Sequence, residues 1–151
     1  MNGLHKEYYP NGKLAAHGQY VNGKKEGSWE WFNSNNGMLW CKGLYENDQK
    51  EGLWISFGSD GNNVSEFRYH KGKLHGPMRC FYKGVLTKLG SYSQDKRHGP
   101  WEHFFHSGSI MTQGQYVDGL EEGLWKNFAP EGHVRDTCTF DKGEVVARET
   151  K

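Results

Sequence analysis

The sequence is poor in proline and cysteine, and it has no long hydrophobic run. Only 4 of its 151 residues are proline and glycine follows no Gly-X-Y period, which excludes a collagen-like chain. The three cysteines lie far apart without a Cys-x-x-Cys spacing, which favours reduced thiols over a disulfide framework. Nowhere do about 18 apolar residues follow one another, and the N-terminal residues lack the apolar centre of a signal peptide. We therefore expect no membrane span and a cytoplasmic location.

An excess of charge of either sign is also lacking. The 19 Lys and Arg residues nearly balance the 18 Asp and Glu residues, and the segments before and after His75 are each close to neutral. Nucleic acids and anionic membranes attract proteins with a large basic surplus. The charge balance thus favours neither as a partner.

Glycine and aromatic residues are plentiful instead. The chain has 21 glycines, about twice the usual share of roughly 7%, which argues against a mostly helical protein. It also has 6 Trp, 8 Tyr and 8 Phe, whereas disordered chains are depleted in such rings. Large rings spread over a Gly-rich sequence indicate a thin structure held by cross-strand aromatic contacts.

Internal repeats organise the whole chain. Four stretches align with a period of 23 to 25 residues, Gly18–Phe32, Gly43–Phe57, Gly90–Phe104 and Gly114–Phe128, and a weaker copy begins at Glu66. In this alignment Glu66 and Thr137 stand where the leading glycine is expected, and Met78 replaces a Trp. We expect one repeat domain with a partial cap at 1–17, repeats at 18–42, 43–65, 66–89, 90–113 and 114–136, and a partial cap at 137–151.

Each period contains two turn signals. One series is Asn22-Gly23, Asn47-Asp48, Lys71-Gly72, Gln94-Asp95 and Asp118-Gly119, and the other is Asn36-Gly37, Asp60-Gly61, Lys83-Gly84, Ser107-Gly108 and Glu131-Gly132. The stretches between them are five to nine residues long and rich in aromatic and β-branched residues, as strands are. The predicted fold class is all-β, an elongated antiparallel meander of repeated β-hairpins with about a dozen strands.

Alternation along the strands separates two faces. Trp29, Trp54, Met78, Trp101 and Trp125 are three residues before Phe32, Phe57, Phe81, Phe104 and Phe128, so the two series should lie on opposite faces. Two residues after each Trp position come Trp31, Ser56, Cys80, His103 and Asn127, which differ in every copy. Repeated positions hold such a fold, whereas variable positions on a shared face can specify a partner.

Three histidines and two carboxylates are candidates for a catalytic or metal site. His98, His103 and His106, with Asp95 and Glu102, could form a metal or acid-base cluster, but His98 occupies a turn position that other copies fill with Glu. No helical or zinc-knuckle spacing directs the three histidines to one point. The glycine-rich turns match no phosphate-binding motif, and there is no nucleophile elbow. We expect a protein that is not an enzyme and has no catalytic residue, metal or cofactor.

Aromatic residues that the repeat does not require are the best candidates for partner binding. They are Trp31, Trp40, Phe67, Tyr82 and Phe105, of which Trp31, Tyr82 and Phe105 should share the face of the Trp series. The alternative is that they fill space over glycines of neighbouring strands. His103 is a further candidate, as are Lys88 and Lys96, which lie in a segment with five basic residues and one acidic, Arg79 to Arg97. The segment from Asp118 to Glu144 has seven acidic and three basic residues, a contrast that could orient a partner.

The repeated unit Gly-x-Tyr-x-Asn-Gly-Lys-x-x-Gly-x-Trp-x-x-Phe resembles the MORN repeat variant family, including its YwqK-like antitoxins. The match is best in Gly18–Phe32 and Gly114–Phe128, and it covers nearly the whole chain. The resemblance implies a non-enzymatic, protein-binding repeat protein, an antitoxin or immunity protein whose partner is a toxin encoded by a neighbouring gene. The alternative is a MORN-type scaffold that organises proteins or contacts membrane lipids.

Overall fold

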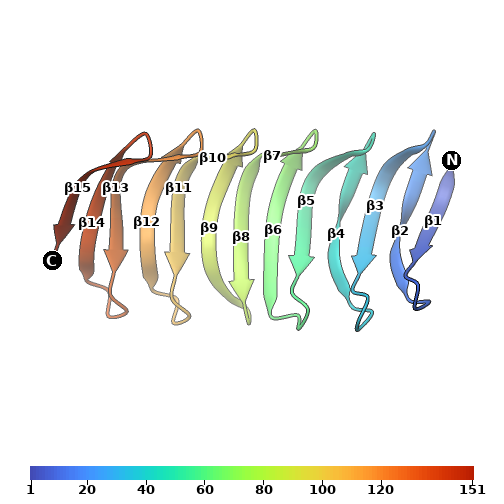
Figure 1. The fold of residues 1–151 in the computed structure, drawn as a ribbon, viewed down its shortest axis with the longest axis horizontal. Coiled ribbons are helices and arrows are strands. Elements are labelled where there is room, and N and C mark those ends of the chain that lie inside the picture. The colour runs from blue at the N-terminus through green and yellow to red at the C-terminus, as the bar shows by residue number, and fades with distance from the viewer. The chain divides into compact units, whose positions relative to one another are not determined.

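The structure is a computed structural model that describes residues 1–151 and contains strands and turns but no helix. The chain forms two compact units, Met1–Lys73 and Leu74–Lys151. In each unit, consecutive long strands pair antiparallel with one another, so the predicted all-β meander of hairpins is confirmed (Figure 1). None of its elements is a helix able to cross a membrane.

The strands of the two units follow one another in chain order. The first unit contains β1 (Gly3–Tyr8), β2 (Leu14–Val21), β3 (Lys24–Phe32), β4 (Leu39–Glu46), β5 (Gln49–Phe57) and β6 (Asn63–His70), and the two-residue β7 (Lys73–Leu74) lies at its boundary. The second contains β8 (Gly76–Tyr82), β9 (Val85–Ser93), the two-residue β10 (Lys96–Arg97), β11 (Gly99–Phe104), β12 (Ile110–Val117), β13 (Leu120–Phe128), β14 (Val134–Asp141) and β15 (Glu144–Thr150).

The two series of turns lie at opposite ends of the strands. The first series consists of two-residue turns with positive φ at both positions, as at Asn22 (51°) and Gly23 (79°). This conformation matches the twist of paired strands and favours Asn, Asp and Gly. Most of the second series are longer loops, although Lys83 and Gly84 again form a two-residue turn with positive φ. Figure 1 shows short turns along one end of the strands and longer loops along the other.

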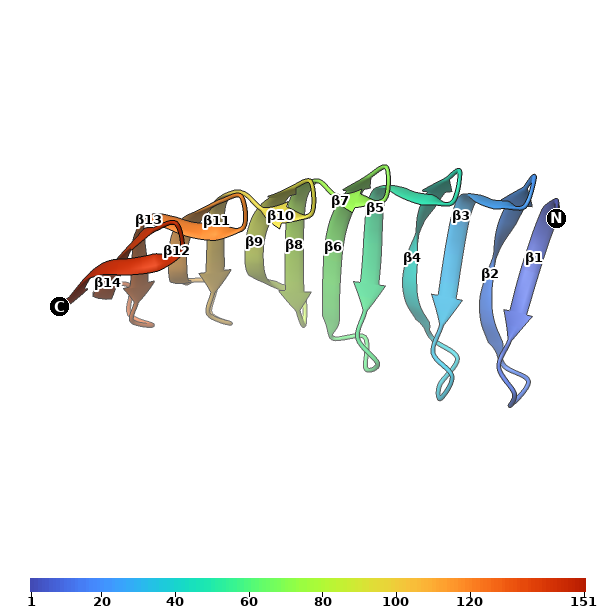
Figure 2. The ribbon, with the colours of Figure 1, turned by 45° about the horizontal axis from the view of Figure 1, so that its top comes forward.

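Each long strand that carries a Trp or Met bends at the second glycine of its repeat. Gly27, Gly52, Gly76, Gly99 and Gly123 all have positive φ, between 70° and 108°. The pairing of β2 with β3 shifts register nearby, between His17 and Gln19. As a result the short-turn end of each hairpin turns away from the rest of the strand (Figure 2).

Hydrogen bonds between successive short turns link neighbouring repeats. The N–H of Asp48 donates to the carbonyl of Lys25 at 3.0 Å, and the N–H of Gly119 donates to the carbonyl of Arg97 at 2.8 Å. A second bond joins the first turn residue to the side chain before the bend glycine of the preceding repeat. That acceptor is Glu26 for Asn47 (2.9 Å), Glu51 for Lys71 (2.8 Å) and Glu122 for Lys142 (2.9 Å).

Histidine takes the place of this glutamate in two repeats of the second unit. His75 Nδ1 accepts the N–H of Gln94, and His98 Nδ1 accepts the N–H of Asp118, each at 3.3 Å. An imidazole can accept a hydrogen bond at Nδ1 only while that nitrogen is unprotonated. The turn position of His98, which the sequence shows alternating with Glu, is thereby explained as an acceptor for a neighbouring turn.

The Glu51 link predicts a dependence of stability on pH. Its carboxylate accepts the Lys71 N–H and, at 3.0 Å, contacts His70 Nδ1, and these bonds hold the pKa of Glu51 below its usual 4.5. A lowered folded-state pKa stabilises the protein above the unfolded-state pKa, and this contribution is lost as the pH falls through the folded-state value. Glu51→Gln should therefore flatten the loss of stability below about pH 4.5, measured by urea unfolding across pH 3 to 6. Glu46→Gln, an exposed neighbour, should leave the pH profile unchanged; equal profiles for both variants would contradict the prediction.

Candidate functional site

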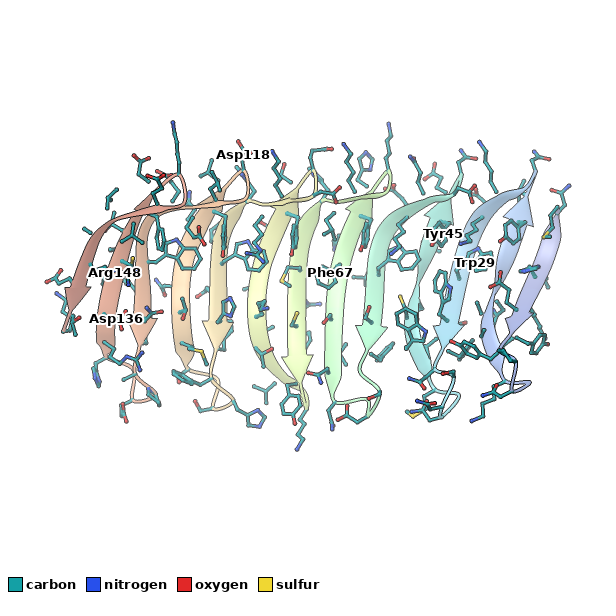
Figure 3. The ribbon with its side chains drawn as sticks, in the orientation of Figure 1. Trp29, Tyr45, Phe67, Asp118, Asp136 and Arg148 are labelled. Atoms are coloured by element: carbon teal, nitrogen blue, oxygen red, sulfur yellow. The ribbon has the colours of Figure 1, made fainter.

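A layer of aromatic rings in contact with one another covers one face of the hairpins, here called the Trp face. Its repeated members Trp29, Trp54, Met78, Trp101 and Trp125 are only 1% to 8% exposed. Trp54 lies between the tyrosines of two repeats, with ring centroids 5.1 Å from Tyr45 and 6.1 Å from Tyr69, both edge to face. Its Nε1 donates to the carbonyl of Leu44 at 3.1 Å, and the other three Trp residues make the equivalent bond. Figure 3 shows Trp29 and Tyr45 projecting from this face.

The leading glycine of a repeat lies directly beneath its Trp ring. A Cβ atom on Gly43 would lie 2.1 Å from the ring of Trp54, and Gly18, Gly90 and Gly114 stand in the same relation to Trp29, Trp101 and Trp125. Only a residue without a side chain allows the ring to approach the backbone so closely. The leading glycine is therefore required by packing and not by a turn.

The opposite face, here called the Phe face, carries the phenylalanine series. The centroid of the Phe32 ring lies 5.5 Å from that of the His17 ring. His17 Nε2 lies 3.6 Å from Glu30 Oε1, and the Arg79 guanidinium lies over the Phe81 ring. Trp31, by contrast, stacks on Trp29. The predicted separation of the Trp and Phe series onto opposite faces is confirmed.

On the side of the buried rings that is nearer the long loops, the variable positions of the Trp face form a row across the strands. In the second unit the row runs Cys80, Lys88, His103, Thr112, Asn127 and Asp136, each residue opposite the next on the adjacent strand. In the first unit it runs Ala16, Trp31, Cys41, Ser56 and Ser65. Directly opposite residues in antiparallel strands share a face and lie within side-chain contact distance. The second unit thus presents a continuous polar row.

The acidic end of this polar row is hydrogen-bonded internally. Thr112 Oγ1 donates to Asn127 Oδ1 at 3.0 Å, and Asn127 Nδ2 donates to Asp136 Oδ1 at 2.6 Å. Arg135 Nε lies 3.4 Å from the other carboxylate oxygen, and Figure 3 shows Arg148 beside Asp136 on the neighbouring strand. The bond from Asn127, followed by the contacts with Arg135 and the charge of Arg148, lowers the pKa of Asp136. Asp136 is therefore ionised, and both of its carboxylate oxygens already have hydrogen-bond partners.

The basic end of the polar row lies on β9 and β11. Lys88 and His103 are directly opposite each other and both are half-buried. Burial lowers the pKa of His103, and the charges of Lys88 and Arg97 lower it further. Arg97 itself lies over Trp101, 5.5 Å from the ring centroid, and donates to the Tyr116 hydroxyl at 3.3 Å. This end is basic, and its imidazole is mostly neutral at pH 7.

Shallow grooves on the Phe face recur at the leading glycines. One of about 370 Å³ lies over Gly43 and is lined by Leu44, Leu53 and Ile55 together with Glu30 and Lys42. Equivalent grooves of about 260 and 420 Å³ lie over Gly114 and Gly18. These grooves result from the missing side chains of the glycines.

The candidate residues named from the sequence lie in four different places. Trp31, Lys88 and His103 are on the Trp face, where Trp31 is half-buried between Trp29 (5.8 Å) and Trp54 (5.5 Å). Trp40 is 42% exposed and lies at a β-bulge of β4, between Leu39 opposite Phe32 and Cys41 opposite Trp31. Lys96 is exposed at the short-turn end, against the next turn at Gly119.

Tyr82 and Phe105 belong to the long-loop end of the second unit. Tyr82 ends β8, is 38% exposed and lies 6.0 Å from the His106 ring. Phe105 follows the last residue of β11, and its N–H closes the loop by donating to Ser109 at 2.8 Å. Strand alternation ends at Phe104, so it does not assign the Phe105 side chain to either face.

The weaker repeat also needs a correction in alignment. The strand register places Phe67 opposite Trp54 and Cys138 opposite Trp125, as Gly43 is opposite Trp29. Phe67 and Cys138 therefore take the leading-glycine position, one residue later than Glu66 and Thr137. Figure 3 shows Phe67 on the same face as Trp29.

Thr112 and Asp136 were missed as members of the candidate site. The sequence marked Asn127 as a variable position, but its partners lie 15 and 9 residues away, and only the strand register brings them together. The acidic character of the segment from Asp118 to Glu144 was the one signal that pointed toward Asp136. No group of three or more His, Cys, Asp and Glu side chains is placed to hold a metal ion.

Comparison with known families connects this architecture to a repeat type. The profile of the MORN repeat variant family matches residues 1–22 and 97–118. The chain carries MORN repeat variants. A MORN repeat indicates a repeat scaffold of the protein- or lipid-binding kind.

Other comparisons give little beyond the MORN repeat variants. No curated protein matches the chain. A crystal structure of a mutant TarM from S. aureus, in complex with fondaparinux, alpha-GlcNAc-glycerol and UDP, is 14% identical with a TM-score of 0.33, over 79% of this chain and 19% of that one. A second TarM structure is 13% identical with a TM-score of 0.26, over 76% and 18%. This chain thus spans less than a fifth of the length of those proteins.

Proposed function

We propose that this protein is not an enzyme and that it binds another protein through the Trp face of its hairpins. The observation that carries the proposal is the row of non-repeated side chains next to the repeated ring layer. In repeat proteins, repeated positions maintain the fold and the variable positions between them are available for recognition.

Within this class we propose an antitoxin or immunity protein. It would act in the cytoplasm and neutralise a protein toxin encoded by a neighbouring gene, by covering the toxin's active site or a surface that the toxin needs. An open sheet face is suited to this task because it offers a wide, preorganised surface at little cost in conformational entropy. The contrast between the segments Arg79–Arg97 and Asp118–Glu144 would orient the partner as it approaches.

The second candidate is a MORN-type scaffold that organises proteins or contacts lipids. The exposed leucines of the Phe face favour it, since Leu44 is 48% and Leu124 51% exposed beside the grooves over the leading glycines. Anionic lipids require a basic patch as well. The net charge of +1 and the Glu30 and Glu102 carboxylates in these grooves weigh against lipid and leave a protein scaffold as the form of this alternative.

The test is binding to the product of the neighbouring gene, measured by surface plasmon resonance with variants of the two faces. Trp31→Ala should weaken the complex by about 2 kcal/mol, as truncation of an aromatic anchor does. Phe105→Ala tests the long-loop end of the second unit in the same way. Leu44→Ala removes an exposed apolar side chain from the same unit as Trp31 but on the Phe face, and it should leave the affinity unchanged.

The outcomes separate the two candidates. Loss of affinity in Leu44→Ala with normal binding of Trp31→Ala would move the interface to the Phe face and favour the scaffold. No binding of the neighbouring gene's product, with no rescue of growth when the two are co-expressed, would contradict the antitoxin role. Thermal melts of each variant show whether a loss of binding comes from unfolding.

A further inference from the structure

The basic end of the polar row carries charge that nothing in its surroundings compensates. Lys88 and His103 lie directly opposite each other on adjacent strands and are half-buried. The side chain of neither residue makes a hydrogen bond or an ion pair. Basic groups on neighbouring strands of one face repel each other when both are charged. Arg97, the next basic group, adds to the repulsion, since its charge also acts on His103.

The nearest carboxylate in the row is too far away to balance this charge. From His103 the row passes through Thr112 and Asn127 before it reaches Asp136, three strand spacings away. At about 4.8 Å per spacing this is roughly 14 Å, longer than the screening length of about 8 Å at physiological salt. Asp136 is also occupied by Asn127 and Arg135. Glu102, adjacent in sequence to His103, lies on the opposite face.

Other basic residues of the Trp face have partners of a different kind. Lys25, Lys50 and Arg97 lie over the faces of the ring layer, with Lys50 Nζ 4.6 Å from the centroid of Trp54. Such cation-ring contacts compensate part of the cost of burying a cation. His103 lies opposite Thr112 and Lys88 lies opposite His103, and neither side chain makes a ring contact, so both remain available to a ligand.

We infer that Lys88 and His103 form a binding site for the carboxylate of an Asp or Glu side chain on an extended segment of the partner protein. The inference rests on the proposed function and specifies the chemistry of the partner. The Lys88 ammonium supplies charge, and the His103 imidazole donates a hydrogen bond to the same carboxylate. Thr112 and Asn127 follow along the row, where they can contact the polar groups of the residues beside that Asp or Glu.

The site predicts that binding is coupled to protonation of His103. Its pKa is lowered by burial and by the charges of Lys88 on β9 and Arg97 on β10. The other neighbours in the row are Cys80 on β8, opposite Lys88, and Thr112 on β12, opposite His103. A bound carboxylate reverses the local charge balance and favours the protonated ring. Affinity should therefore rise as the pH falls from 7 toward 5, because partner carboxylates, with pKa values near 4, stay ionised over most of this range.

The experiment is an NMR titration of the full chain, observing the imidazole signal of His103, which is assigned with the His103→Gln variant. The probe is an acetylated and amidated hexapeptide with three glutamates, added to about 10 mM, and the control probe has glutamine in their place. We expect the His103 signal to move and its pKa to rise with the glutamate peptide only. Lys88→Gln should weaken the binding by about fivefold or more, because it removes half of the site.

Lys126→Gln is the matched control variant. It removes one positive charge from the same unit but on the Phe face, and the titration should be unchanged. The inference is overturned if the His103 signal does not move, if both peptides move it equally, or if Lys126→Gln weakens binding as much as Lys88→Gln. Loss of Lys88 with no change in affinity for the neighbouring gene's product would refute the site while leaving the proposed function standing. Peptide binding at His103 without binding of that product would support the site and refute the antitoxin role.

Discussion

Replacing Trp54 by alanine is expected to lower the free energy of unfolding by about 3 to 5 kcal/mol, as truncation of a buried ring does elsewhere. The ring is 3% exposed, contacts Trp31, Tyr45 and Tyr69, and donates a hydrogen bond to Leu44. Its removal leaves a cavity in a thin layer that has no second layer behind it to fill the space. Urea unfolding followed by circular dichroism measures the loss.

Tyr8 provides the comparison for this variant. It occupies the edge strand β1 and is 60% exposed, so Tyr8→Ala should cost clearly less than Trp54→Ala. In a repeat array, stability is roughly a sum of unit and neighbour terms, and a residue with one neighbouring strand contributes fewer of them. Equal losses for the two variants would argue against this additive picture and for a single closed core.

Gly43→Ala is expected to destabilise the protein by about 3 kcal/mol, the upper part of the usual range for overpacking. The added methyl group would lie 2.1 Å from the Trp54 ring, and this ring is held on both sides by tyrosines. Gly61→Ala is the control, since Gly61 has a φ of 76° but nothing within 4 Å of a Cβ atom. It should cost only the backbone strain, about 1 kcal/mol.

A second substitution tests the cause of this loss. If the ring is what the methyl group meets, Trp54→Met should cost less in the Gly43→Ala background than in the native chain, because a flexible thioether can move aside. The sequence offers a parallel, since the repeat with Phe67 at the leading position is the one with Met78 in place of Trp. Additive effects of the two substitutions would show that the loss arises from the backbone of Gly43.

Much of the fold could be predicted because its signals are local and repeated. Asn22-Gly23 specifies a two-residue turn by itself, and the odd spacing of Trp29 and Phe32 is enough to place them on opposite faces. The weaker repeat was misaligned at Glu66 for a physical reason. The leading glycine is defined by a ring that lies over it, and where the Trp is replaced by Met78 the sequence loses both markers of that position.

The candidate site was harder to predict because it depends on register between strands. His103 and Lys88 are 15 residues apart, and a shift of one residue in pairing would send one of them to the Phe face. Trp31 was identified as a candidate, but its stacking between Trp29 and Trp54 needed the positions of three strands. The face of Phe105 does not follow from alternation, because the strand ends at Phe104 and alternation holds only while the chain remains extended.

The hydrogen bonds between short turns allow the number of hairpins to change. They do not allow the length of a single hairpin to change. Every such bond, from Asp48 to Lys25 or from Gly119 to Arg97, joins only adjacent repeats and uses backbone groups that all repeats possess. Removal of one whole period would bring equivalent donors and acceptors together again, whereas removal of one or two residues within a strand would break the bonds on both sides. Gene duplication and loss can therefore lengthen or shorten the binding surface in whole periods of 23 to 25 residues, and a lineage can match the span of a new partner without redesigning the framework.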